Sequence, residues 1–215
     1  MKKTSMEEAA GSTLIQREEI RVLYHGGYLK GRGLEELIKS VVYWDKNINL
    51  YFRGYGPIEE YLRRQVSSLS LENRVIFLEP VPMERLIADA AFADIGIIPY
   101  KPTCLNNYYS MPNKLFEYMM AGLAVAASDL PEIRRLNEEV GFGLLFNPDS
   151  PETIAGSINN LARDKDFLQA CRGNARTWSG TAGNWETESG KLVDFYRDIF
   201  SSNQQKVCRG EINEK

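Results

Sequence analysis

The stretch IRVLYHGGYLKGRGLEELI, residues 20–38, contains the three parts of one folding unit. A mostly apolar run that suits a buried strand is followed by the glycine-rich segment HGGYLKGRG and then by leucines at helical spacing. A strand, a glycine-rich loop and a helix in this order are typical of α/β proteins. Because loop glycines let backbone N–H groups approach a ligand, the unit also predicts an anion site beside the helix start.

The same alternation continues along the rest of the chain. Further strands are predicted at 48–52, 75–78, 95–100, 123–128 and 142–146. Helices are predicted from Leu34, Pro57, Met83, Pro112 and Pro151, with a last one over about 185–200. Residues 101–111 are predicted to be a loop. The strands are apolar on both faces, so we expect a single Rossmann-like, doubly wound parallel sheet over residues 20–200, between a flexible leader (1–19) and a polar tail (201–215).

Composition narrows the class of protein. The 215 residues are 43% hydrophobic and 26% charged, as in ordinary globular domains. A net charge of −3 predicts neither a nucleic-acid partner nor more than peripheral membrane contact. Three scattered cysteines indicate reduced thiols and a cytoplasmic location, and the single histidine argues against multi-histidine metal sites. The acidic residues at 7 and 8 argue against a signal peptide, and no apolar stretch approaches a bilayer span.

The glycine loop carries two cations, Lys30 and Arg32. It fails the dinucleotide fingerprint because position 36 is glutamate, and it fails the P-loop pattern because Arg32 and Gly33 follow Gly31. An unliganded tight turn is therefore the alternative. His25 is expected to line the cleft, since the sequence provides no partner that would make it a general base.

Three further segments end strands or open helices. In RGYGP (53–57), Gly54 and Gly56 would keep side chains out of a cleft, although a plain turn is an equal reading. In FLEPVP (77–82), backbone groups could read the edge of a base. In MPNKLFEYMMAG (111–122), Pro112 places the amides that follow it at the positive end of a helix, and Glu117 lies one turn further in. A solvated or ion-paired surface glutamate is the alternative for Glu117.

In this order, LYHGGYLKGRGLEELI, LYFRGYGPIEEYL, VIFLEPVPMERL, ADIGIIPY, MPNKLFEYMMAGLAVAASDLPEI and GFGLLFNPDSPETIAGSINNLARD resemble one family. They are similar to the C-terminal, donor-binding half of retaining nucleotide-sugar glycosyltransferases of GT-B architecture, group 1 or family four. The resemblance covers residues 20 to about 200.

The resemblance implies a role for each segment. Arg32 and Glu117 would be the catalytic pair, with Arg32 on the donor diphosphate and Glu117 on the ribose hydroxyls. No metal or other cofactor is expected, because helix amides would support the diphosphate charge. The implied donor-binding residues are Gly26, Gly27, Lys30, Gly33, Gly54, Gly56, Leu78, Glu79, Val81, Tyr109, Asn113, Lys114 and Leu115.

Two departures from the family pattern concern charge. Tyr109 stands where the first glutamate of a paired motif is expected, and Gly26 and Gly27 occupy the place of a usual arginine. Lys30 or Lys114 would then replace that arginine's charge. A further departure is length, since the acceptor-binding domain of GT-B enzymes has no counterpart here. The expectation is a donor-binding half that needs a separate acceptor domain; a nucleotide-sugar-binding module and a remnant without catalysis are the alternatives.

Overall fold

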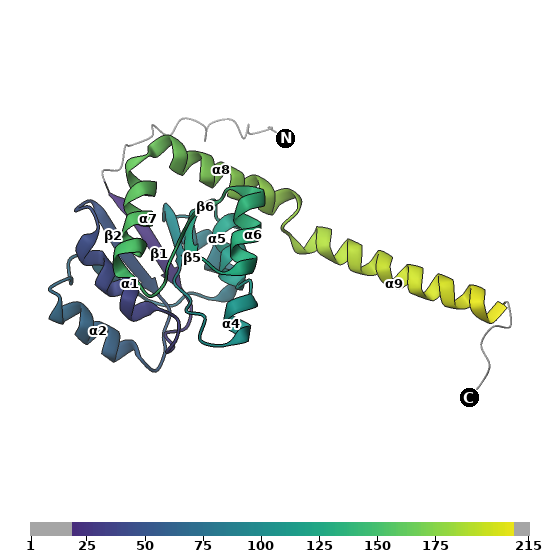
Figure 1. Ribbon diagram of the computed structural model, residues 1–215, viewed down its shortest axis with the longest axis horizontal. Coiled ribbons are helices and arrows are strands. Elements are labelled where there is room, and N and C mark those ends of the chain that lie inside the picture. Colours follow the sequence, from purple (N-terminus) through teal and green to yellow (C-terminus); the bar gives the residue numbers. More distant parts are fainter. Residues whose placement is uncertain (1–18, 209–215) are drawn as a thin grey trace, which may run out of the picture.

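Six strands form one sheet in the order β3-β2-β1-β4-β5-β6, and every adjacent pair is parallel. The computed structural model describes residues 19–208, with side chains described through residue 200 (Figure 1). The strands are β1 (Ile20–His25), β2 (Ile48–Arg53), β3 (Val75–Leu78), β4 (Ile95–Ile98), β5 (Ala124–Ser128) and β6 (Gly143–Phe146). The predicted α/β class and doubly wound sheet are confirmed.

Helices or 3-10 turns connect successive strands, and three helices follow the last strand. They are α1 (Leu34–Ser40), η1 (Val41–Tyr43), α2 (Glu59–Ser68), η2 (Met83–Arg85), α3 (Leu86–Ala90), α4 (Leu105–Tyr109), α5 (Asn113–Met120), α6 (Pro131–Val140), α7 (Pro151–Arg163), α8 (Lys165–Thr181) and α9 (Trp185–Cys208).

The alternation of side chains along the strands builds two hydrophobic layers. Val22 and Tyr24 point to one face, which α1, α2 and α7 cover, whereas Leu23 points to the other, which α3, α5 and α6 cover. Helix α8 contributes to both layers. Both sides of the sheet are thus removed from water, which is the usual condition of an all-parallel sheet.

The direction of strand addition reverses next to β1. After β1 the chain builds β2 and β3 on one side, then crosses to place β4 on the other, with Val22 opposite Ile95. Ligands of such sheets bind outside the carboxyl ends of the strands where this reversal occurs. The fold therefore directs attention to the loops that leave β1 and β4.

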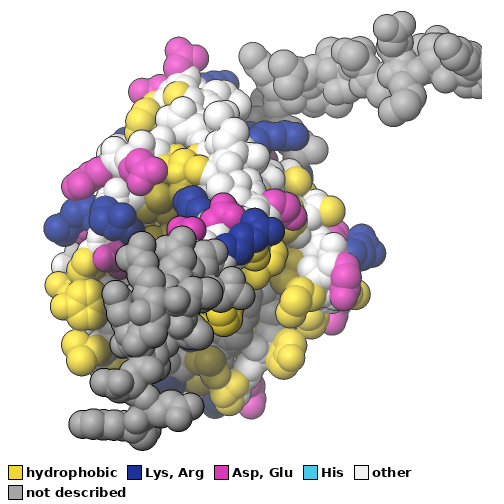
Figure 2. Space-filling model, turned by 90° about the vertical axis from the view of Figure 1, so that its right-hand side faces the viewer, with side chains coloured by type: hydrophobic (Ala, Val, Ile, Leu, Met, Phe, Trp, Pro, Cys, Tyr) yellow, Lys and Arg dark blue, Asp and Glu magenta, His cyan; other side chains and the backbone are white. Residues whose placement is uncertain are grey.

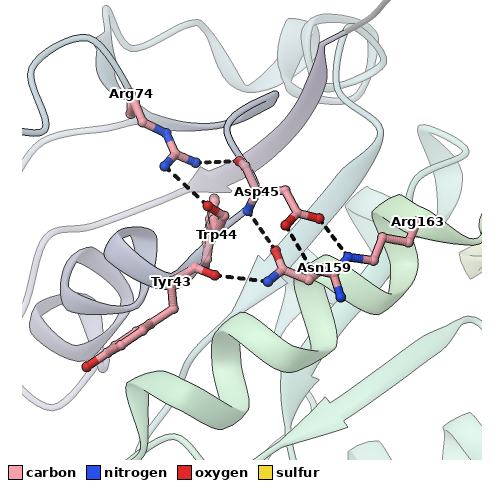
Figure 3. Close-up of polar contacts among 6 residues, drawn as sticks. All are labelled: Tyr43, Trp44, Asp45, Arg74, Asn159 and Arg163. Carbon is pink, nitrogen blue, oxygen red and sulfur yellow. Dashed lines mark hydrogen bonds and ion pairs between the residues drawn. The ribbon is translucent and has the colours of Figure 1, made fainter.

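Polar contacts connect the segments at the amino-terminal ends of the strands, which we call the amino edge of the sheet (Figure 3). Arg74, just before β3, donates to the carbonyls of Asp45 and Ile48, both at 2.7 Å, and to those of Val41 and Trp44, both at 3.3 Å. From α7, Asn159 accepts from the Asp45 amide and donates to the Tyr43 carbonyl, and Arg163 pairs with the Asp45 carboxylate at 2.8 Å. These contacts fasten α7 to the turn that enters β2.

Several helices differ from the sequence prediction. Helix α2 starts at Glu59 because Pro57 lies in a turn closed by Glu59 N–H on the Gly56 carbonyl, 3.1 Å. Helix α4 lies inside the predicted loop 101–111. Helices α6 and α8 were not predicted, and α9 runs to Cys208, past the predicted end near 200.

Helix α9 projects away from the sheet in Figure 1. Its large apolar side chains are exposed, among them Trp185 (71%), Phe195 (60%) and Phe200 (66%). On the face shown in Figure 2, basic and acidic side chains are interspersed, with hydrophobic ones between them. Within the part of the chain that the structure describes, no helix combines the length and the apolar character needed to cross a membrane.

Candidate functional site

A cavity of about 430 Å³ opens at the point where strand order reverses. Its volume falls in the range of about 300–1,000 Å³ that is typical of small-molecule sites. The loops after β1 and β4 and the first turns of α5 form its walls. The lining includes His25, Gly26, Arg32, Tyr100, Lys114 and Glu117.

A second cavity of about 390 Å³ adjoins the first and is mostly apolar. The two share Gly26 and Leu86, so they are two chambers of one cleft. The second chamber is lined by Gly27, Leu29, Arg53, Gly54, Tyr55, Gly56, Pro57, Pro80 and Val81 as well. Gly54 has φ +149°, and a Cβ there would lie 2.1 Å from the Gly26 carbonyl oxygen, so glycine is required for the two loops to meet.

Glu117 faces the first chamber and is held by His25. Its Oε2 lies 2.8 Å from His25 Nε2, and the bond to His25 lowers the pKa of the carboxyl below its ordinary value. His25 is fixed in turn: its ring stacks on Tyr118 at 4.5 Å, and its backbone N–H donates to the Tyr118 hydroxyl at 2.9 Å. The one carboxylate of this apolar helix is therefore an oriented, ionised acceptor beside a cavity.

Lys114 is the most buried cation of the site. Its side chain enters from the first turn of α5, and only 7% of the residue is exposed. The Nζ atom lies 3.9 Å from the ring centroid of Tyr24 and 5.0 Å from that of Tyr100. It has no hydrogen-bond partner among the described residues. Burial, with a smaller contribution from Arg32, lowers the pKa of Lys114 to about 7.

Arg32 lies against the same aromatic ring. Its guanidinium carbon is 4.1 Å from the centroid of Tyr100, whose hydroxyl pKa is raised by burial. Stacking on a neutral ring leaves the guanidinium N–H groups to point outward. The first chamber thus combines two basic side chains, an oriented carboxylate and the amino end of α5, which is an arrangement suited to an anion that also carries hydroxyl groups.

The structure brings together most of the residues named from sequence. Gly26, Arg32, Asn113, Lys114 and Glu117 line the first chamber. Gly26, Gly27, Gly54, Gly56 and Val81 line the second. His25, expected as a lining residue, is one, and it is also the partner of Glu117.

Three of the residues named from sequence lie elsewhere. Lys30 is exposed and is not among the described residues that line either chamber. Gly33 serves packing, because a Cβ there would lie 1.8 Å from the Pro99 carbonyl oxygen. Leu115 has its side chain in the core, and its N–H donates to the Pro112 carbonyl at 2.9 Å, so that amide is already used.

Three more named residues stand beside the cleft without lining it. Leu78 and Glu79 precede the wall, which Pro80 and Val81 form instead. Tyr109 is 59% exposed on α4, where its ring meets that of Tyr108 edge to face at 4.8 Å. The same segment does reach the first chamber, through Asn106 and Ser110.

Sequence reasoning missed the aromatic walls. Tyr24 and Tyr100 read as strand residues in apolar runs, and only the structure shows their rings against Lys114. Arg53, which closes β2 and lines the second chamber, was also missed. The signal that could have revealed these residues is their place at the carboxyl ends of β1, β4 and β2, where such sheets bind ligands.

A further hollow in the described part of the chain lies away from this cleft. A larger hollow of about 890 Å³ lies between α7 and α8, and Leu144 near the start of β6 places it at the amino edge. Among the described residues, no three His, Cys, Asp or Glu side chains are grouped as a metal ion would require.

The fold and the position of this cleft define a domain of the GT-B class of sugar transferases. The profile of the family described as "Glycosyl transferases group 1" matches residues 5–178, so the chain belongs to that family.

Curated relatives agree with this assignment. An uncharacterized glycosyltransferase of Methanocaldococcus jannaschii is 24% identical over 187 residues, which is 85% of this chain and 46% of the relative. The GDP-mannose:cellobiosyl-diphosphopolyprenol alpha-mannosyltransferase of Xanthomonas oryzae is 27% identical over 184 residues, 83% of this chain and 47% of the relative. The chain therefore spans about half the length of the curated relatives it matches.

Solved structures share the fold. Sucrose-phosphate synthase from Thermosynechococcus elongatus has a TM-score of 0.73 at 22% identity, covering 86% of this chain and 46% of that one. Anabaena HepE in complex with UDP also has a TM-score of 0.73, at 19% identity and with 84% and 49% coverage. The C-terminal domain of a group 1 glycosyl transferase from Francisella tularensis has a TM-score of 0.66 at 16% identity, and 87% of that domain is covered.

Proposed function

We propose that this chain binds the nucleotide-diphosphate sugar donor of a retaining glycosyl transfer and forms the donor-binding half of the enzyme. The single observation that carries the proposal is the convergence of Arg32, Lys114, Glu117 and the amino end of α5 on one cavity at the switch point of a group 1 domain.

Each chamber suits one part of such a donor. In the first, Arg32 and the α5 amides would hold the diphosphate, and Glu117 would accept hydrogen bonds from the ribose hydroxyls. The apolar second chamber, with Val81 in its wall, would take the base. No resident cofactor or metal ion is expected, since cations and amides of the chain would neutralise the leaving diphosphate. The leaving phosphate would guide the acceptor on the same face of the sugar, which retains anomeric configuration.

The acceptor would be bound by a separate domain. Matched relatives are about twice as long as this chain, and α9 offers an apolar, exposed surface where another domain could pack. A glycan or a lipid-linked glycan is the proposed class of acceptor, because the named activity of the Xanthomonas relative uses a diphosphopolyprenol-linked sugar. On its own, the chain would bind donor without transferring it, and its expected setting is the cytoplasm.

Calorimetry tests this proposal. UDP, GDP, UDP-glucose and GDP-mannose are titrated into the wild type, because matched structures and relatives name both bases. Arg32→Met and Glu117→Gln should each weaken binding about 10- to 100-fold, the equivalent of one charge-assisted hydrogen bond. The exposed residues Arg64 and Glu72 provide matched controls, and Arg64→Met and Glu72→Gln should bind as the wild type does. Failure of all four ligands to bind would overturn the proposal.

A nucleotide-sugar-binding module without any catalytic partner is the second candidate, because the two chambers of this one domain would supply the donor contacts proposed above. Donor binding together with transfer when an acceptor domain is added supports the enzyme half. Donor binding with no transfer in the presence of such domains supports the module.

A further inference from the structure

Lys114 is a cation whose counter-ion is missing from its surroundings. Four elements face it: β1 with Tyr24 and His25, the loop before α1 with Arg32, the end of β4 with Tyr100, and α5 with Glu117. Among the described residues no carboxylate lies within ion-pair distance of its Nζ, because Glu117 is turned toward His25.

The neighbouring rings cannot supply that charge. Burial raises the pKa of both Tyr24 and Tyr100, so each stays neutral at ordinary pH. Their faces attract the ammonium, but a cation–π contact is weaker than the hydration that the buried group has lost. Arg32 adds repulsion, and the more distant charge of Glu117 offsets part of these effects without reversing them. These effects favour the neutral amine in the ligand-free protein, in agreement with a pKa lowered to about 7.

Lys114 lines the first chamber, and in the ligand-free protein its Nζ lies shielded from solvent behind the chamber wall. Gly26 has no side chain to cover it, and a Cβ at that position would come within 3.0 Å of Nζ. Both residues line the same cavity as Arg32. An anion bound there would supply the missing partner.

We propose that Lys114 is a conditional cation, which takes up a proton from solvent when the donor diphosphate enters the first chamber. The proton adds to the lone pair of Nζ, and the resulting ammonium pairs with a diphosphate oxygen. Lys114 thereby adds a second positive charge, beside that of Arg32, to the chamber that holds the diphosphate. This inference rests on the proposed function and adds to it a coupling between donor binding and protonation.

This coupling between donor binding and protonation predicts the direction in which affinity for the donor changes with pH. The bound state holds more protons than the free state, so affinity for the donor decreases as the pH rises above about 7. At about pH 8 close to one proton should be taken up per donor bound, and at about pH 6 only a small fraction, because the free amine is then already protonated.

Calorimetry on the full chain tests the coupling. UDP-glucose and GDP-mannose are titrated at each pH in two buffers of different ionisation enthalpy, which gives the number of protons taken up. Nucleotide sugars are chosen because their diphosphate diester has no proton to exchange in this range. Lys46→Met, which changes an exposed lysine, is the control and should show the uptake of the wild type.

The proton must also be assigned to Lys114. In protein with ¹³C-labelled lysine, the Lys114 Cε resonance, identified by its loss in Lys114→Arg, should titrate near neutral pH without donor and stay protonated with donor. Lys114→Arg carries a permanent charge, so any binding that it retains should occur without proton uptake.

The outcomes are distinct. Donor binding without proton uptake overturns this inference and leaves the proposed function standing. Uptake with an unchanged Lys114 resonance also overturns it, since the proton would then belong to another group. Absence of binding by any donor contradicts the proposed function itself, and this inference with it.

Discussion

Glu117 shows how one residue depends on its neighbours. A carboxylate on an apolar helix is costly unless it meets water or a partner. In this protein it meets both, because the side chain is 29% exposed toward the cavity and its other side is bound by His25. The sequence indicated that the residue was unusual, but His25 is 92 positions away and only the fold brings the two together.

The pairing predicts how stability depends on pH. Since the pKa of Glu117 is lowered below its ordinary 4.5, its contribution is present above that pH and is lost as pH falls through the folded-state value. Glu117→Gln should therefore lower the free energy of unfolding by about 1 kcal/mol at neutral pH and by less at pH 3.5. Urea unfolding at both pH values measures this, with the exposed Glu72→Gln as control. A difference that does not change with pH would contradict the assignment.

Gly54 and Gly173 form a matched pair of predictions. An alanine at 54 would need φ +149° and would clash with the Gly26 carbonyl, so Gly54→Ala should destabilise the protein by at least about 2 kcal/mol. Position 173 lies within α8, and a Cβ there meets nothing within 4 Å. Gly173→Ala should therefore stabilise the protein by about 0.5–1 kcal/mol. Denaturant unfolding compares them, and equal effects would show that the Gly54 loop can relax.

At the scale of elements, the strands could be predicted from the sequence more completely than the helices. All six strands were located to within two residues, because buried parallel strands are short apolar runs between turn residues. Helix α6 was missed although the sequence carries its start and stop signals, since Pro131 is its first residue and Gly141 ends it at φ +70°. Helix α4 escaped because its five residues bury no side chain completely and carry no periodic signal.

Arg74 connects several elements at the amino edge. It donates to four carbonyls that belong to η1, the turn after it and the start of β2, and Figure 3 shows the contacts with Trp44 and Asp45. Arg74→Met should leave those carbonyls without their donor and lower the free energy of unfolding by about 2–4 kcal/mol. Arg64→Met, on the exposed face of α2, should change it by no more than about 0.5 kcal/mol. Donor binding at the opposite edge should persist in both variants. A small effect of Arg74→Met would mean that solvent replaces the guanidinium.

At the scale of the whole molecule, the sequence predicted which loops form the cleft better than it predicted which side chains point into it. The loops that follow strands could be named in order, and parallel strands bring their carboxyl ends to one edge. Which side chains turn inward depends on packing between distant segments. Lys30 and Lys114 were equal candidates for the missing charge, and only the structure separates the exposed side chain from the buried one.

Helix α9 carries the prediction that concerns association. A helix with exposed Trp185, Phe195 and Phe200 favours contact with another surface, so the isolated chain should self-associate as its concentration rises. Phe195→Ser combined with Phe200→Ser should reduce this association in sedimentation experiments. The melting temperature of the sheet domain should shift by less than about 2 °C, since neither side chain belongs to the core. As a control on the same helix, Lys191→Ser combined with Arg197→Ser should change neither the self-association nor the melting temperature. Association that persists in the phenylalanine variant would mean that another surface mediates it.

The central place of β1 in the sheet also affects how the chain folds during synthesis. The ribosome releases β1 before β4, its neighbour on one side, which begins only at Ile95. A nascent chain that ends before that point can pair β1 with β2 and β3 alone, which leaves one edge of β1 open to solvent and to other chains. Parallel pairing across such separations is slow to form. The growing polypeptide therefore passes through an interval of exposed strand edge, in which a chaperone would be most useful.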